Sequence, residues 1–310
     1  MELIKSLKAL GDDTRLRIVN ILSQYELQVN EIVDVLDMGQ PRISRHLKIL
    51  ADHDLLTARR DGLWAYYSVA RGNGHSALID TIIQHLSADP DPHYRNDLNR
   101  AAQVLDERKN RTRSFFNTIA GEWEDLKKNI FGDFDIVRAI LDELPAITSV
   151  ADLGCGTGDL IPALRDRASC VIGVDSSPAM IELARKKLSA LGDAVDLRLG
   201  ELEHLPIGNG EVDAVIINMV LHHVSQPPAA LREAYRIVKR GGLCIITDFE
   251  KHADEHVRQA YGDRWLGFDR EQISSWSKDA GFVVEKTNRF PVRGGLSIQC
   301  FVNRSNVVSN

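Results

Sequence analysis

The sequence predicts an α/β protein that carries a smaller α+β head at its N-terminal end. From about Asp135 onward, helical and strand-like segments alternate, which implies a mostly parallel sheet. Residues 1 to about 90 instead contain several short helical patterns and a single hairpin pattern. The chain has 310 residues and an apolar content of 44%, which is enough for two domains with separate cores.

Composition limits the classes of function. The net charge of −6 does not indicate nucleic-acid binding by the whole chain, so any DNA contact requires a local basic patch. The N-terminus lacks the apolar core of a signal peptide, and no apolar run approaches the ~20 residues of a membrane span, so we expect a cytoplasmic protein. The four scattered cysteines fit reduced thiols better than disulfides or a zinc site, and no metal site is expected.

The stretch Val150–Asp159 is typical of a buried strand, a glycine-rich turn and the start of a helix. A turn without Cβ atoms allows a ligand to lie against the backbone, and the helix N-terminus favours anionic groups. The spacing is G-x-G-x-G, whereas dinucleotide folds use G-x-G-x-x-G. A second strand ends in Asp175, where a ribose-binding acid is expected. A tight turn that binds nothing is the alternative.

This constellation resembles the S-adenosylmethionine (SAM) site of class I methyltransferases, with SAM or S-adenosylhomocysteine (SAH) as the ligand. In this interpretation Asp175 accepts hydrogen bonds from the ribose hydroxyls and Glu201 accepts one from the adenine amino group. Asp152 either orients the loop or meets the ligand's ammonium group through water. Met180 and Leu202 sandwich the adenine in this interpretation, or are ordinary core residues. The other expected ligand residues lie in the turn or directly after strands: Gly154, Cys155, Gly156, Thr157, Gly158, Ser176, Asn218 and Met219.

The expected sheet has seven strands. The predicted strands are Ser149–Leu153, Val171–Val174, Asp196–Leu199, Ala214–Asn218, Leu243–Thr247, Phe282–Thr287 and Leu296–Asn303. Ligands of such sheets bind at the carboxyl ends of the strands, and the residues named above follow four of these ends. The expected fold is therefore Rossmann-like, as in class I methyltransferases.

The head shows the pattern of a helix-turn-helix. A short helix over Val29–Leu36 precedes a turn, and a helix from Gln40 to about Asp52 follows, with an apolar face that includes Ile43 and Leu47. An amphipathic helix with a solvated basic face is the alternative. The residues on the polar side that we expect to contact DNA are Gln40, Arg42, Ser44, Arg45, His46 and Lys48.

A hairpin follows the second helix. Leu56–Arg60 and Leu63–Val69 alternate like strands, with Asp61-Gly62 as the expected turn. A helix-turn-helix with a basic hairpin is a winged helix, so we expect Arg59 and Arg60 to lie beside the minor groove. The last helix of the head is expected over His75–Leu86.

Residues 1 to about 90 resemble the ArsR family of bacterial repressors, on the stretches Leu7–Ile18 and Gln40–Leu50 and on the hairpin through Tyr66-Tyr67. The family implies a homodimer that binds palindromic operator DNA, with the first and last helices of the head at the interface. Metal sensors of the family often carry a Glu-Leu-Cys-Val-Cys motif. This chain has Gln28 and Asn30 in place of the cysteines, and Asn73, His75 and His85 match a second family site only partly.

The joint between the two halves contains two prolines and aromatic residues. Asp89-Pro-Asp-Pro-His93 predicts an extended linker, and Asn96–Arg113 predicts a charged connecting helix. The segment from Phe115 to Glu124 resembles the lid of small-molecule methyltransferases. Trp123 is then either a cofactor-binding side chain or part of the core.

The C-terminal half resembles UbiE-like class I methyltransferases, also on Asn218–His223 and Asp263–Phe268, as found fused to ArsR heads. We therefore predict an ArsR-type DNA-binding regulator whose methyltransferase-like domain binds SAM or SAH as effector. The alternative is an active methyltransferase with a small-molecule acceptor, in which His222 or His223 is a catalytic base or merely lines the site. The predicted domains are 1–92, a connecting helix and lid over 93–134, and 135–310.

Overall fold

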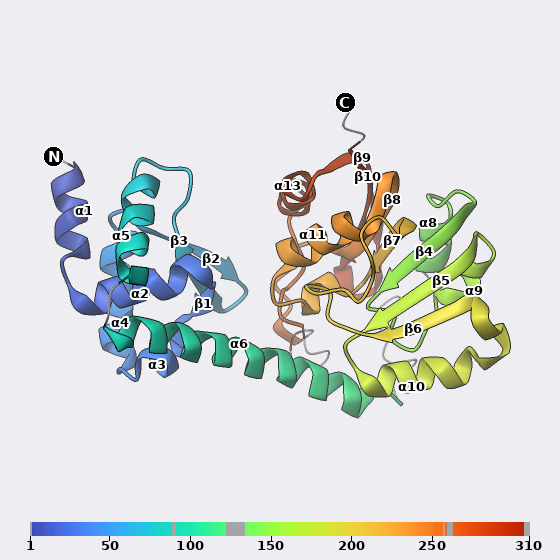
Figure 1. Ribbon diagram of the computed structural model, residues 1–310, viewed down its shortest axis with the longest axis horizontal. Coiled ribbons are helices and arrows are strands. Elements are labelled where there is room, and N and C mark those ends of the chain that lie inside the picture. Colours follow the sequence, from blue (N-terminus) through green and yellow to red (C-terminus); the bar gives the residue numbers. More distant parts are fainter. Residues whose placement is uncertain (1, 89–90, 122–133, 257, 259–262, 307–310) are drawn as a thin grey trace. The chain divides into compact units, whose positions relative to one another are not determined.

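The computed structural model describes residues 2–88, 91–121, 134–256, 258 and 263–306 (Figure 1). The chain divides into two compact units, Met1–Lys109 and Asn110–Asn310, and each is described by itself. No helix in the described part of the chain is both long enough and apolar enough to cross a membrane.

The first unit is a bundle of short helices with one small antiparallel sheet, in which β3 lies between β1 and β2 (Figure 1). Its elements are α1 (Glu2–Leu10), α2 (Asp13–Gln24), β1 (Leu27–Gln28), α3 (Val29–Leu36), α4 (Gln40–Ala51), β2 (Leu56–Asp61), β3 (Trp64–Val69), α5 (Ser76–Ala88) and the first part of α6 (Pro92–Ile119).

Local sequence sets the helix boundaries of the head. Asp12 caps α2 by accepting a hydrogen bond from the backbone N–H of Arg15 over 3.1 Å. Gln28 and Glu31 form a reciprocal capping box at the start of α3. The α3–α4 pair therefore has the expected boundaries, and Ile43 and Leu47 face the core of the head as predicted.

Two local predictions in the first unit are wrong. The hairpin turn consists of Gly62-Leu63, because Asp61 is still paired with Trp64 and Gly62 has the positive φ of 60° that this turn needs. The predicted extended linker fails at Pro92, which is the first residue of α6. A proline in the first turn of a helix removes no intrahelical hydrogen bond, so it can begin the helix as well as break one.

The second unit is a seven-stranded sheet with helices on both faces (Figure 1). The strand order is β6-β5-β4-β7-β8-β10-β9, and β10 runs in the opposite direction to the other six strands. The strands are β4 (Ile147–Leu153), β5 (Ala168–Asp175), β6 (Val195–Leu199), β7 (Val212–Asn218), β8 (Val238–Phe249), β9 (Phe282–Pro291) and β10 (Ser297–Ser305).

Among the described residues of this unit, the α-helices besides the end of α6 are α8 (Ile136–Leu141), α9 (Ile161–Arg165), α10 (Pro178–Lys187), α11 (Pro227–Ile237) and α13 (Arg270–Ala280). The short 3-10 helices there are η1 (Ser189–Ala194), η2 (Leu221–His223) and η3 (Arg293–Gly295).

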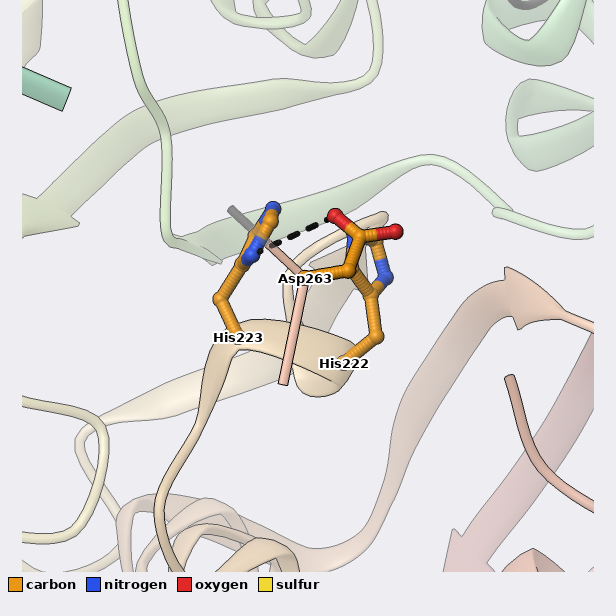
Figure 2. A group of neighbouring side chains, drawn as sticks. All are labelled: His222, His223 and Asp263. Atoms are coloured by element: carbon orange, nitrogen blue, oxygen red, sulfur yellow. Dashed lines mark ion pairs between the residues drawn. The ribbon is translucent and has the colours of Figure 1, made fainter. Parts of the chain in front are cut away.

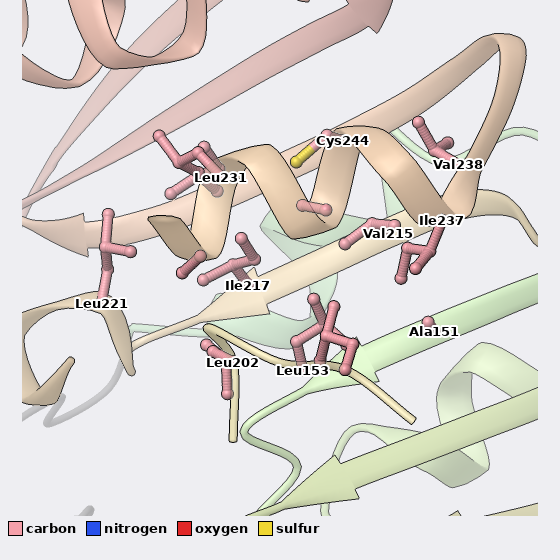
Figure 3. Packing of buried hydrophobic residues seen from close by; sticks show 14 of the residues in the cluster. Ala151, Leu153, Leu202, Val215, Ile217, Leu221, Leu231, Ile237, Val238 and Cys244 are labelled. Carbon is pink, nitrogen blue, oxygen red and sulfur yellow. The ribbon is translucent and has the colours of Figure 1, made fainter. Parts of the chain in front are cut away.

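Alternation along the strands produces two hydrophobic cores, one on each face of the sheet. Ile217 of β7 packs with α11 and α13 in one cluster, whereas its neighbour Ile216 packs with α8, α9 and α10 in the other. Figure 3 shows the first cluster, where Leu231 and Ile237 of α11 lie over β7 and β8. The predicted fold class, a Rossmann-like sheet with a winged-helix head, is confirmed. It places the ends of β4, β5, β6 and β7 side by side.

Candidate functional site

The glycine-rich turn after β4 has the backbone that the sequence predicts. Gly154, Gly156 and Gly158 have φ values of 76°, 52° and 79°, a region that residues with a Cβ rarely adopt. Close packing adds a second reason for two of them. A Cβ on Gly154 would lie 2.5 Å from Val220, and one on Gly158 would lie 2.7 Å from Leu188. These glycines therefore hold the turn tightly against its own protein neighbours.

Asp175 fixes this turn from the end of β5. Its carboxylate accepts hydrogen bonds from the backbone N–H of Gly156 over 2.9 Å and of Ser177 over 2.8 Å. Burial raises the pKa of Asp175, while these hydrogen bonds and one from the Ser176 N–H oppose the rise. One carboxylate thus links the two loops that are predicted to bind the ribose and the rest of the nucleoside.

Asp152, at the end of β4, is a buried acid with only 2% of its surface exposed. Within the described part of the chain, no group donates a hydrogen bond to its carboxyl. Burial and the neighbouring charge of Asp175 raise its pKa to about 7. A ligand that brings a positive charge or hydrogen-bond donors would lower the free-energy cost of a charged carboxylate at this buried position. The site therefore fits SAM or SAH, whose amino-acid part carries an ammonium group.

The other predicted ligand side chains lie around the same strand ends. Met180 and Leu202 are buried, at 2% and 5% exposure, and Leu202 belongs to the core cluster on one face of the sheet. Asn218 accepts a hydrogen bond from the Thr247 hydroxyl over 2.7 Å. Met219 has a φ of 52°, which is strained for a side chain of this size. Trp123 lies outside the described residues.

Thr157 and Cys155, two residues of the turn, differ in what their side chains can do. The Thr157 hydroxyl donates to the Asp159 carboxylate over 3.1 Å. Burial and the charges of Asp152 and Asp175 raise the pKa of the Cys155 thiol well above its ordinary value. Cys155 is therefore a neutral, weakly nucleophilic thiol at physiological pH.

The last turns of α6 contact these loops. Arg113 donates a hydrogen bond to Glu201 over 2.7 Å. The side chain of Asn117 accepts from the Ser177 hydroxyl over 2.7 Å. Thr112 accepts from the Arg264 guanidinium over 3.1 and 3.2 Å. One short helical stretch, residues 112–117, therefore binds loops that follow β5, β6 and β8.

Two histidines follow β7 in η2, and both are buried (Figure 2). The Nδ1 atom of His222 lies 2.7 Å from Oδ1 of Asp248, and its Nε2 lies 3.6 Å from Oδ1 of Asp263. The Nδ1 atom of His223 lies 3.7 Å from the same Asp263 oxygen. The ring of Phe116 packs edge-on against His223, with centroids 4.7 Å apart.

The carboxylates determine the charge of His222. Burial by itself would lower its pKa, but the charges of Asp248 and Asp263 outweigh burial and raise the pKa to about 9. At neutral pH His222 is then an imidazolium, which already holds the proton that a general base would have to accept.

The predicted DNA-contacting face of α4 is accessible. Gln40, Arg42, Ser44, Arg45 and Lys48 are exposed, and Ile43 and Leu47 are buried behind them. A basic, exposed surface opposite a packed face is what a recognition helix requires.

Three of the predicted DNA contacts have protein partners, and one of them, Arg42, donates a hydrogen bond to the Thr14 hydroxyl over 3.3 Å. Arg59 pairs with the Glu26 carboxylate over 2.8 and 3.1 Å and lies over the Tyr66 ring at 4.5 Å. His46 lies 3.7 Å from the Asp12 carboxylate, and burial lowers its pKa. The guanidinium of Arg59 therefore supports the wing of the head, whereas Arg60 on the same strand is exposed.

Sequence reasoning missed several residues of the site. It did not single out Arg113, Asn117, Asp248 or Asp263 as site residues, although Asp263 lies in a motif that it noted. Asp248 also had a visible signal, because it is an acid within the apolar run of β8. The roles of Arg113 and Asn117 depend on where the end of α6 lies, which no local pattern encodes.

Two families match this chain in its two halves. Residues 12–58 match the family described as "Bacterial regulatory protein, arsR family". Residues 151–246 match the family described as "Methyltransferase domain". The second match runs from β4 into β8 and so contains all four strand ends of the site.

Similar proteins match mainly the C-terminal half. A demethylmenaquinone methyltransferase from Thermus thermophilus is 33% identical over 152 residues, which are 47% of this chain and 69% of the enzyme. An uncharacterized 37.1 kDa protein of transposon TN4556 from Streptomyces fradiae is 35% identical over 159 residues, and the match spans only about half of each chain, at 46%. Among solved structures, the [4+2]-cyclase SpnF matches 57% of this chain and 86% of its own at a TM-score of 0.51 and 18% identity, which shows a shared fold alone.

Proposed function

Because this chain belongs to the class I SAM-dependent methyltransferase family and carries an ArsR-family DNA-binding domain at its N-terminal end, we propose that it is a ligand-responsive transcriptional regulator. SAM or SAH, the ligand pair of such a methyltransferase domain, would serve as the effector. The methyltransferase domain would take the place of the metal site that ArsR-type sensors use.

The observation that carries this proposal is the course of α6. In the first unit, Asp97 of α6 pairs with Arg17 over 2.7 and 2.8 Å, and Arg108 pairs with Glu31 of α3. In the second unit, residues 112–117 of the same helix contact the loops around the predicted nucleoside site. A ligand that displaces those loops would change the hydrogen bonds that they make with residues 112–117. The same helix also forms part of the head, through Asp97 and Arg108.

The chain's own residues suit the ligand. Asp175 would accept hydrogen bonds from the ribose hydroxyls, and Asp152 would face the ammonium group. Glu201 would accept from the adenine amino group, which makes Arg113 and the adenine competitors for one carboxylate. We propose that this exchange of partners on Glu201 is the step between ligand binding and movement of α6.

The head contributes DNA recognition and dimerisation. The exposed polar side of α4 would enter the major groove, and Arg60 would lie on the wing. Leu3, Ile4 and Leu7 of α1 are 58%, 58% and 48% exposed, which supports a second copy of the chain as their partner. We propose that a homodimer binds a palindromic operator, and that the chain acts in the cytoplasm.

The residue at the position of the family's first metal-binding cysteine supports a signal other than a metal ion bound in the head. Gln28 stands there, and its side-chain amide donates to the Tyr66 hydroxyl over 2.7 Å. That amide is thus part of the hydrogen bonding of the wing. We retain 1–92, 93–134 and 135–310 as the functional division of the chain, in which 93–134 connects the two binding functions.

Linkage provides the test. If SAH changes operator affinity by some factor, operator DNA must change SAH affinity by the same factor. Calorimetric titration of SAH into the full chain, with and without its upstream operator DNA, should give affinities that differ at least several-fold. Equal affinities would refute the regulator and leave an independent DNA-binding head.

An active methyltransferase is the second candidate, and the buried His222–Asp248 pair favours it as a fixed hydrogen-bonding group that can orient an acceptor, rather than as a general base. SAM, when bound, supplies an electrophilic methyl group, and the chain mainly has to align an acceptor with it. The pair follows β7, at the edge where a small-molecule acceptor would approach. Turnover of SAM to SAH with candidate acceptors, lost in His222→Ala but not in the solvent-exposed control His85→Gln, would support this function.

A further inference from the structure

We infer that His222, His223 and Asp263 form a binding site for one divalent transition-metal ion of the zinc, cobalt(II) or iron(II) class. Three ligand atoms, one from each residue, lie within 4.8 Å of one another (Figure 2). The donor set is two imidazole nitrogens and one carboxylate oxygen, which is a set that proteins use for these ions.

The distances agree with a shared ion. The Asp263 Oδ1 atom lies 3.6 Å from Nε2 of His222 and 3.7 Å from Nδ1 of His223. Two ligand atoms on one tetrahedral zinc ion lie about 3.3–3.6 Å apart, given zinc–ligand distances of about 2.0–2.2 Å. The two carboxylate–imidazole separations are close to this range, and all three ligand atoms lie within 4.8 Å of one another, so side-chain movements would bring them into coordination.

The surroundings supply an outer shell. Metal-binding histidines usually donate their second ring nitrogen to a carboxylate, which fixes the ring and its tautomer. Here Asp248 lies 2.7 Å from the Nδ1 atom of His222 and also accepts from the His222 backbone N–H over 3.2 Å. The Nε2 atom is thereby directed at Asp263. The rings of Phe116 and Phe249 pack against the two histidines.

The backbone brings the third ligand to the first two. The N–H groups of Arg264 and Trp265 donate to the carbonyl oxygen of His222 over 3.0 and 3.1 Å. This anchors the residue before them, Asp263, beside η2. Segments about 40 positions apart in the sequence thus meet at one point. Because of this separation, no short sequence motif would reveal the site.

Charge balance favours a divalent ion. Asp248 and Asp263 are 0% and 4% exposed, so two carboxylates lie in the interior. An ion of charge +2 that displaces the proton of the His222 imidazolium matches the charge of these two carboxylates, while both imidazoles bind it as neutral ligands. Buried charges require such compensation, because isolated charges are costly in the interior.

The test is metal binding by the chelator-treated full chain, measured by equilibrium dialysis with Zn²⁺ and by the visible absorption of Co²⁺. We expect about one ion per chain. Asp263→Asn and His223→Gln should weaken binding at least about 10-fold, and Asp248→Asn by about 10- to 100-fold. The control is His85→Gln, which removes an exposed histidine of the head and should leave the stoichiometry unchanged.

Several results would overturn the inference. They are a wild-type chain that binds neither Zn²⁺ nor Co²⁺, an Asp263→Asn variant with wild-type affinity, and loss of the ion in His85→Gln. Unaltered circular dichroism and SAH affinity would establish that the variants are folded. The wild-type Co²⁺ spectrum tests the site even if a variant fails to fold, since nitrogen ligands are visible in it.

Discussion

Arg113, near the end of α6, donates a hydrogen bond from Nη2 to Oε1 of Glu201 over 2.7 Å. Glu201 is the residue that sequence analysis assigned to the adenine amino group. The carboxylate is partly exposed and can turn toward a ligand, with side-chain exposure of 36% for Arg113 and 29% for Glu201. This pair is the contact at which ligand binding would reach α6.

We predict that Arg113→Gln uncouples the two sites. SAH would still bind, because Arg113 is not one of the proposed ligand contacts, and operator affinity without ligand would stay within about twofold. The effect of SAH on operator affinity should fall toward a factor of one. Arg111→Gln is the matched control, because Arg111 is exposed on the same helix. If SAH changed the operator affinity of Arg113→Gln as much as that of the wild-type chain, the Arg113–Glu201 contact would not transmit ligand binding.

Asp175→Ala tests the position of the nucleoside site. The substitution removes a carboxylate that holds Gly156 and Ser177 and is proposed to bind the ribose. Calorimetry should show SAM and SAH binding weakened by roughly 1.5–3 kcal/mol, the scale of hydrogen bonds to a charged group. Glu182→Ala, at an exposed position of α10, should have no effect. A folded Asp175→Ala chain with wild-type affinity would show that the site lies elsewhere.

The raised pKa of Asp152 predicts that the free energy of unfolding depends on pH. Its pKa is about 7 in the folded chain and 3.8 as an ordinary aspartate, so the native state favours the protonated form. This residue's contribution to the free energy of unfolding is therefore largest below about pH 4, falls as the pH rises to about 7, and stays constant above it. Asp152→Asn should stabilise the ligand-free chain at about pH 8, by on the order of 1–3 kcal/mol, but not at about pH 4.

The same substitution should weaken SAH binding at about pH 8, because a neutral amide replaces the charge that faces the ammonium group. Denaturant unfolding measures the first effect and calorimetry measures the second. Asp142→Asn, at an exposed position, is the control for both. If Asp152→Asn were less stable than wild type at about pH 8, the carboxylate would have a partner that this account omits.

Arg45 and Arg59 should behave differently, although sequence analysis assigned both to DNA. Arg45→Ala should weaken operator binding by at least about 10-fold without affecting stability, because the side chain is exposed on α4. Arg59→Ala should lower the free energy of unfolding by about 1 kcal/mol through loss of its partly exposed pair with Glu26. Electrophoretic mobility shift and thermal unfolding separate the two effects, with Arg95→Ala as an exposed control on α6. A stable Arg59→Ala chain that loses DNA would restore Arg59 as a direct contact.

Much of this architecture was predictable because local patterns encode it. The strands ending at Leu153, Asp175 and Asn218 are runs of apolar residues, and the glycine-rich turn has a distinctive spacing. The residue type of Pro92 did not reveal whether it lies in a linker or begins a helix, since proline can end one element or begin another. The turn at Gly62-Leu63 differs by one residue from the expected one because the register of β2 and β3 decides it.

The parts of the site that sequence reasoning missed are contacts between distant segments. Arg113 meets Glu201 across 88 positions, and His222 meets Asp248 across 26. Such pairs depend on the strand order, in which β7 lies between β4 and β8. Likewise, Arg59 was expected to face DNA because the sequence shows its charge but not its pairing with Glu26.

The most direct test of the regulator is an operator titration of the full chain under three conditions: no ligand, saturating SAM and saturating SAH. A ligand with equal affinity for both conformations shifts no equilibrium, so one ligand must favour or oppose the DNA-binding form. We predict that SAH changes operator affinity at least several-fold, on the order of 1–3 kcal/mol of coupling, and that SAM changes it less. Three superimposable titration curves would contradict the central claim that the methyltransferase domain controls DNA binding.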